Sequence, residues 1–74
     1  MIEIFGTENC QYCSDARTLC AQKELSYIYT PIDLYMDKYE ELVEKIGNFK
    51  TVPQILVDGH HIGGYEELRD YVYG

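Results

Sequence analysis

The stretch NCQYCSDARTLC, residues 9–20, holds all three cysteines of this 74-residue chain and sets the fold of its N-terminal half. Before it, residues 2–5 alternate apolar and polar side chains up to Gly6, which predicts a short strand followed by a turn. From Cys13 on, apolar side chains recur at intervals of three and four, which predicts a helix over about residues 11–23. The cysteines therefore stand where a strand gives way to a helix.

The predicted helix has an apolar face and a start that a polar side chain can cap. Its apolar face is formed by Cys13, Ala16, Leu19 and Cys20. Thr7 and Asn9 belong to the residue types whose side-chain oxygens accept hydrogen bonds from the free N–H groups of a first helical turn, and we expect one of them to cap it. Cys10 then lies at or just before the first turn, and Cys20 is expected to be a buried, inert thiol.

The remaining residues predict a strand, a helix, a hairpin and a last helix. The strands lie at residues 26–34, 54–57 and 60–62, and the helices at residues 36–46 and 65–73. Pro31 cannot donate to a strand ladder and predicts an edge position or an irregularity. Gly47 predicts the end of the second helix, and Asp58-Gly59 is a strong signal for a two-residue hairpin turn.

This order of elements predicts a single α/β domain over residues 1–74. The first strand–helix–strand unit should be parallel and right-handed, and the hairpin should add antiparallel strands. We therefore expect a four-stranded mixed sheet flanked by three helices, with helices on both faces. Four tyrosines are expected to pack in or beside the core: Tyr27, Tyr29, Tyr39 and Tyr71.

Composition excludes several classes of function. The formal net charge of -7 argues against nucleic-acid binding, which needs clustered lysine and arginine. No apolar run is long enough for a membrane span, and the N-terminal residues MIEIFGT lack the basic and apolar regions of a signal peptide, so we expect no membrane association. Three cysteines placed this closely do not form a secreted disulfide framework, which favours a reducing compartment, the cytoplasm.

Two cysteines three positions apart can clamp a metal, form a structural crosslink or act as a redox pair. Their position at a helix start favours the redox pair, because backbone N–H groups and the helix dipole stabilise a thiolate there and lower its pKa. Cys10 is accordingly the predicted nucleophile. Cys13, one turn further in, is the predicted resolving thiol. A zinc site with His60-His61 is disfavoured, since adjacent strand residues point to opposite faces.

Two stretches carry a resemblance to a known family: IFGTENCQYC at residues 4–13 and TVPQILVDGHHIGGYEEL at residues 51–68. Together they resemble a dithiol glutaredoxin of the bacterial or phage type, over nearly the whole chain. The resemblance implies a thioredoxin-like fold and a monomeric thiol-disulfide oxidoreductase with no bound cofactor and no metal. Glutathione would be its co-substrate. Its substrates would be protein disulfides or glutathione mixed disulfides, and ribonucleotide reductase would be one such protein partner.

The resemblance also implies a glutathione site made of three separate segments. Its residues would be Tyr12, Thr51, Val52, Pro53, Gly64, Tyr65, Glu66 and Glu67. A cis Pro53 would turn the Val52 backbone toward Cys10, where it would pair with glutathione as a strand does. The helix start at Tyr65 would receive the γ-glutamyl carboxylate, and Glu67 would hold the neighbouring ammonium group.

The chain departs from the family pattern at several of these positions. The family commonly has proline where this chain has Gln11, which leaves the loop freer. Many relatives carry a basic residue near position 7, where this chain has Thr7, so one expected partner of the thiolate or of glutathione is absent. Glu66-Glu67 replaces a common Thr or Ser followed by Asp. Lys50 and Arg17 are each interpreted either as attracting a ligand carboxylate or as simply solvated.

Two further functions stay open at this point. Some glutaredoxins without proline in the motif hold an iron–sulfur cluster between two subunits, ligated by the first cysteine and by glutathione. A redoxin reduced directly by thioredoxin reductase is the other alternative, although Tyr12 and Tyr65 favour glutathione.

Overall fold

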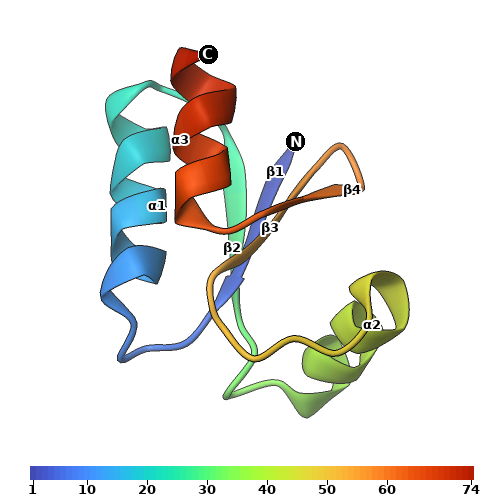
Figure 1. Ribbon diagram of the computed structural model, residues 1–74. Helices are drawn as coiled ribbons and strands as arrows, with labels where there is room; N and C mark the ends of the chain where they lie inside the picture. The colour runs from blue at the N-terminus through green and yellow to red at the C-terminus, as the bar shows by residue number, and fades with distance from the viewer.

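The computed structural model describes all residues, 1–74, and has the predicted order of elements (Figure 1). The strands are β1 (Ile2–Gly6), β2 (Tyr27–Pro31), β3 (Gln54–Val57) and β4 (His60–Gly63). The helices are α1 (Gln11–Gln22), α2 (Met36–Ile46) and α3 (Tyr65–Tyr73).

The four strands form one mixed sheet in the order β2-β1-β3-β4. β1 runs parallel to β2 and antiparallel to β3, and the β3–β4 hairpin is antiparallel, as the sequence predicts. β2 is an edge strand, which agrees with the position of Pro31. The hairpin turn holds Asp58 at φ 51° and Gly59 at φ 83°, the two positive values that a tight two-residue turn requires.

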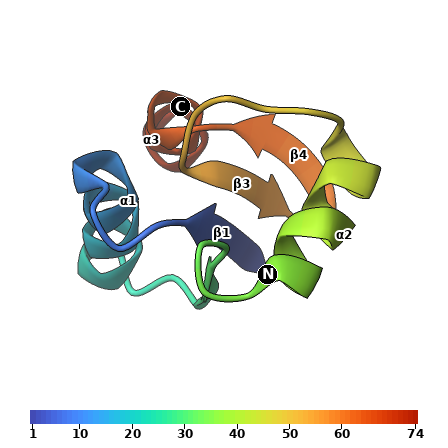
Figure 2. The same ribbon diagram turned by 90° about the horizontal axis from the view of Figure 1, so that it is seen from below.

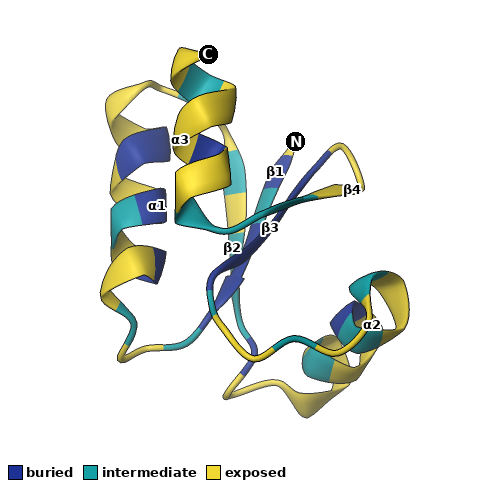
Figure 3. Cartoon of the chain, viewed as in Figure 1, coloured by how far each residue is buried: buried dark blue, intermediate teal, exposed yellow.

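Helices cover both faces of the sheet, and Figure 2 shows α1 and α3 on one side and α2 on the other. The alternation of side chains along the strands supplies both cores. One cluster joins the sheet to α1 and α3 and contains Ile2, Ile4, Ala16, Leu19, Cys20, Ile55, Val57 and Leu68. The other joins the sheet to α2 and contains Phe5, Ile32, Leu42 and Leu56. Figure 3 shows the buried residues along these facing surfaces.

The second strand is shorter than predicted. Residues 26–34 were expected to be extended, but β2 ends at Pro31. The Ile32 N–H group donates to the Gly6 carbonyl at 2.8 Å, and the chain then turns. Ile32 is buried beneath α2. The apolar residues after Pro31 therefore belong to a turn that contributes to the core, and they do not extend the strand.

One of the four tyrosines does not pack as predicted. Tyr27, Tyr29 and Tyr39 are partly buried against the two cores, whereas Tyr71 is 56% exposed. The nine-residue α3 packs through one stripe, with Leu68 fully buried and Val72 beside it. Tyr71 lies outside that stripe and faces solvent.

Candidate active site

Cys10 itself caps α1, so the prediction that Thr7 or Asn9 would do so is wrong. Cys10 directly precedes the first helical residue, has extended backbone angles of φ −126° and ψ 109°, and its Sγ accepts a hydrogen bond from the Cys13 N–H group at 3.1 Å. Thr7 and Asn9 stand too early in the chain for this role. The Cys10 sulfur therefore lies at the positive end of the helix dipole, where a thiolate is stabilised in the reduced protein.

The two cysteines form a disulfide, so the structure represents the oxidised protein. Their Cα atoms are 5.2 Å apart, within the usual range for a disulfide. Cys13 is only 1% exposed, whereas Cys10 is half-buried. A substrate can thus reach the first sulfur more easily than the second.

A groove of about 350 Å³ lies beside the disulfide. It is lined by Tyr12, Thr51, Val52, Pro53, Gly64, Tyr65, Glu66 and Glu67, the eight residues that the family resemblance implied for a glutathione site. They come from the start of α1, the loop before β3 and the start of α3. The rings of Tyr12 and Tyr65, which both belong to this lining, stack on each other with centroids 6.0 Å apart. The fold therefore brings together three segments that are distant in sequence.

Val52 links this groove to the disulfide. Its carbonyl oxygen lies 3.5 Å from Cys10 Sγ, and the Val52–Pro53 peptide bond is cis, as the resemblance implied. The backbone hydrogen bonds of the chain leave the Val52 N–H group without a partner. The buried Gln54 side chain stabilises the loop, because it donates a hydrogen bond to the Thr51 carbonyl at 2.7 Å. Val52 therefore offers an unpaired main-chain donor, with its carbonyl beside the reactive sulfur.

The Gly63-Gly64 pair shapes the other wall of the groove. Gly63 has φ +127°, and a Cβ there would lie 2.7 Å from the Glu67 side chain. Glu67 Oε1 accepts a hydrogen bond from the Gly64 N–H group at 2.7 Å, so its carboxylate helps to cap α3. A carboxylate has about four acceptor sites, so Glu67 keeps capacity for a ligand as well. Lys50 is exposed and does not line the groove.

A second hollow, of about 270 Å³, also adjoins Cys10. Its lining is Thr7, Glu8, Cys10, Ser14, Arg17, Tyr29 and Pro31. The Arg17 guanidinium lies 4.4 Å from the centre of the Tyr29 ring, and the Tyr29 hydroxyl donates to the Thr7 carbonyl at 3.1 Å. Burial raises the pKa of Tyr29, the charge of Arg17 opposes that rise, and Asp33 and Glu8 add to it. Tyr29 was predicted to be a packing residue only. The spacing of Cys10, Ser14 and Arg17, by four and three residues, is the signal in the sequence that could have placed Arg17 on the Cys10 side of α1.

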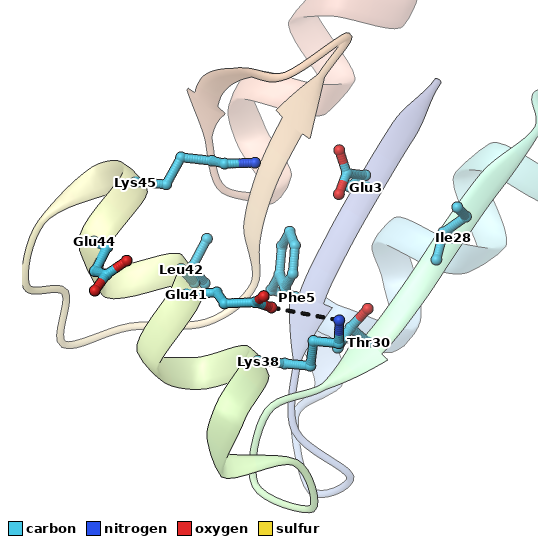
Figure 4. Close-up of a pocket in the computed structure, with 9 residues that line it drawn as sticks. All are labelled: Glu3, Phe5, Ile28, Thr30, Lys38, Glu41, Leu42, Glu44 and Lys45. Atoms are coloured by element: carbon cyan, nitrogen blue, oxygen red, sulfur yellow. Dashed lines mark ion pairs between the residues drawn. The ribbon is translucent and has the colours of Figure 1, made fainter.

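A larger hollow of about 520 Å³ lies between α2 and the strands β1 and β2 (Figure 4). Its charged lining consists of Glu3, Lys38, Glu41, Glu44 and Lys45, with Lys38 and Glu41 paired at 3.4 Å. Neither Cys10 nor Cys13 lines this hollow. Size therefore does not identify the redox site, and the chemistry of the disulfide does.

Cys20 and the histidines, the remaining candidate groups, lie outside the site. Cys20 is fully buried, and burial raises the pKa of its thiol. His61 Nε2 lies 2.8 Å from Gln54 Oε1, and no group of three or more histidine, cysteine or acidic side chains is arranged to hold a metal ion. None of the three helices combines the length and apolar character that crossing a membrane requires.

Comparison with known sequences identifies a matching family and several relatives. The family model described as Glutaredoxin matches residues 2–62. The chain is 42% identical over 67 residues to Glutaredoxin 3 of Escherichia coli (strain K12), an alignment that covers 90% of this chain and 80% of that protein. It is 37% identical over 75 residues to Glutaredoxin 1 of the same strain, covering 93% of this chain and 88% of that protein.

Solved structures give the same result for the fold. Reduced Escherichia coli glutaredoxin superposes with a TM-score of 0.79 at 35% identity, covering 96% of this chain and 91% of that one. A buckwheat glutaredoxin–glutathione complex superposes with a TM-score of 0.79 at 27% identity, covering 96% of this chain and 66% of that one. The four-stranded sheet with three helices is therefore a thioredoxin-like fold of the glutaredoxin type.

Proposed function

The chain belongs to the glutaredoxin family of thiol-disulfide oxidoreductases, and on this premise we propose that its electrons come from glutathione, held in the groove beside Cys10. One observation carries the proposal. The groove is lined by the eight residues that the family resemblance implies, and it reaches Cys10 through the Val52 carbonyl, 3.5 Å from Sγ. The buckwheat relative, whose structure contains glutathione, supports the same conclusion.

In the proposed complex, the cysteine of glutathione lies along Val52. Its backbone pairs with the Val52 N–H and carbonyl groups as an added strand would, which brings its sulfur to Cys10. Tyr12 and Tyr65 flank the tripeptide. The first-turn N–H groups of α3 donate hydrogen bonds to the γ-glutamyl carboxylate, and the Glu67 carboxylate accepts a hydrogen bond from the neighbouring ammonium group. Thr51, Pro53 and Gly64 shape the walls, and Glu66 adds negative charge at the rim.

The proposed reaction is a series of thiol-disulfide exchanges that needs no bound cofactor and no metal. The Cys10 thiolate attacks one sulfur of the client disulfide, forms a mixed disulfide and releases the other sulfur as a thiolate, which takes up a proton. Cys13 then attacks Cys10 Sγ, releases the second client thiol and forms the Cys10–Cys13 disulfide. One glutathione opens that disulfide by bonding to Cys10. A second attacks the bound glutathione sulfur and leaves as glutathione disulfide, so that two glutathiones are oxidised for each client disulfide reduced.

Two substitutions test this assignment. Cys10→Ser should abolish reduction of both protein disulfides and glutathione mixed disulfides. Cys13→Ser should abolish protein-disulfide reduction but retain part of the exchange with glutathione mixed disulfides, because that exchange needs only the first sulfur. Cys20→Ser is the matched control and should retain both activities. Full activity of the Cys10→Ser variant would overturn the assignment.

The electron donor needs its own test. The oxidised protein should be reduced by glutathione, with glutathione reductase and NADPH to regenerate it, and much more slowly by thioredoxin reductase. The opposite preference would replace glutathione by a direct reductase. The same assay with a ribonucleotide reductase disulfide as substrate tests that client, which the family resemblance suggests.

We further propose that the enzyme acts as a monomer in the cytoplasm. Chromatography of the protein with and without iron and glutathione distinguishes a monomer from a cluster-bridged dimer.

A further inference from the structure

We propose that Arg17, held in place by Tyr29, supplies the positive side-chain charge that stabilises the Cys10 thiolate from the second hollow. This concerns the ionisation of Cys10 and holds whichever reducing co-substrate the enzyme uses. It assigns to Arg17 a role in tuning the nucleophile and to Tyr29 a positioning role.

The helix brings Arg17 to the same side as Cys10. Cys10, Ser14 and Arg17 are spaced by four and three residues, which places them along one face of α1, and all three line the second hollow. Seven residues span about 10 Å along a helix. Helical side chains lean toward the N-terminus, which for Arg17 is the end of α1 that holds Cys10, and both residues line the same hollow.

Tyr29 fixes the guanidinium where it can act. The guanidinium lies 4.4 Å from the centre of the Tyr29 ring, well inside the range of a cation–π contact. The ring is itself anchored, because its hydroxyl donates to the Thr7 carbonyl in the loop that leads to Cys10. An exposed arginine that would otherwise sample many rotamers is thereby held beside the redox loop.

The charges around Cys10 make Arg17 distinctive. Among the residues that line the groove and the second hollow, Arg17 is the only one with a positive charge. Three carboxylates oppose it, namely Glu8 in the hollow and Glu66 and Glu67 on α3. Farther out, Asp33 acts on Tyr29, Gln11 donates to Asp15 at 2.9 Å, and Lys50 lies outside both linings. Removing Arg17 would leave the thiolate with the helix start as its main source of positive potential.

The experiment titrates Cys10 in a Cys13→Ser background by the ultraviolet absorbance of the thiolate. Arg17→Met should lower the deprotonation constant of Cys10 by about 1.5- to 5-fold, the range expected for an exposed charge pair. Glu8→Gln should raise it, because a carboxylate disfavours a nearby thiolate. The effect of Arg17→Met should shrink as the salt concentration approaches about 1 M, where screening is strong.

Lys23→Met is the matched control. Lys23 is a cation at the far end of α1 that lies 4.7 Å from the Tyr73 ring, so its removal changes net charge equally without touching the redox loop. Its titration should coincide with that of the Cys13→Ser parent.

Tyr29→Leu tests the positioning role, and it should reproduce the direction of Arg17→Met while adding little to it in the double variant. Thermal unfolding establishes that each variant is folded at the titration temperature. The salt dependence of the Cys10 titration in the Cys13→Ser parent is a second readout, which needs no substitution of Arg17. Coincident titrations of Arg17→Met and Lys23→Met, or a parent titration that does not respond to salt, would overturn the proposal.

Discussion

Gly6 is the position at which the fold and the redox site are most tightly coupled, and Gly6→Ala should destabilise the protein. A Cβ added there would lie 2.5 Å from Cys13 Sγ, 3.0 Å from Cys13 Cβ and 3.3 Å from Tyr29 Cε1. None of these groups can swing away, because Cys13 is buried on α1 and the Tyr29 hydroxyl is bonded to the Thr7 carbonyl. Either β1 or the start of α1 must therefore move.

Overpacking of this kind costs about 1–3 kcal/mol. In a domain of this size each kcal/mol lowers the melting temperature by about 4–8 °C. Urea denaturation of the reduced protein measures the free energy of unfolding directly. Gly64→Ala is the matched control and should cost less, since its added Cβ would meet nothing closer than 3.4 Å.

A double-mutant cycle identifies the cause. Cys13→Ala removes the sulfur that the new methyl group would meet, so Gly6→Ala should cost less in that background, with a coupling of at least about 0.5 kcal/mol. A urea midpoint for Gly6→Ala equal to that of the parent, or a cost unchanged by Cys13→Ala, would refute this account of the packing between β1 and α1.

Two further predictions concern the two cores. Leu42 is the one buried residue of α2, so Leu42→Ala should lower the free energy of unfolding by about 2–5 kcal/mol in urea denaturation, and Val43→Ala on the same helix by less. An equal loss at both positions would contradict the anchoring of α2 through Leu42. For Cys20, burial raises the pKa in the folded state, so the buried neutral thiol contributes stability below the ordinary thiol pKa of about 8.5, and this contribution is lost as the pH rises through the folded-state pKa. In the oxidised protein the stability difference between parent and Cys20→Ala should therefore shrink at alkaline pH, and a difference independent of pH would contradict it.

Most of the secondary structure follows from local patterns in the sequence. The spacing of Cys13, Ala16, Leu19 and Cys20 predicts the buried face of α1, and all four are buried. Gly47 ends α2 with φ 86°, and Asp58-Gly59 forms the hairpin turn, because these positions demand conformations that few residues adopt. Such features are local, which is why a single sequence reveals them.

The errors arose where tertiary contacts override local preference. The Tyr- and Ile-rich stretch after residue 26 is typical of a strand, but burial of Ile32 beneath α2 ends β2 early. Capping preferences favoured Thr7 or Asn9, whereas the length of the loop after β1 makes Cys10 the cap. Tyr71 was assigned to packing from its residue type, but α3 packs through the face that carries Leu68 and Val72, and Tyr71 lies outside it.

The groove could not be derived from local patterns at all. Tyr12, Val52 and Tyr65 are separated by long stretches of chain, and nothing in their spacing says that they meet. Only the family resemblance suggested it, and the sheet order β2-β1-β3-β4 explains it, because β1 and β3 are neighbours and bring the redox loop beside the Val52 loop. The contact of Tyr29 with Arg17 could not be predicted for the same reason.

The most direct test of the account is the reactivity of each cysteine in the reduced protein, measured by brief alkylation over a range of pH and by mass spectrometry of the peptides. Cys10 should be labelled first, with a midpoint below the value of about 8.5 for free cysteine. Cys13 should follow far more slowly, and Cys20 should react only after unfolding. Labelling of Cys13 as fast as Cys10, or a Cys10 midpoint at or above that of free cysteine, would contradict the claim that the start of α1 makes Cys10 the nucleophile.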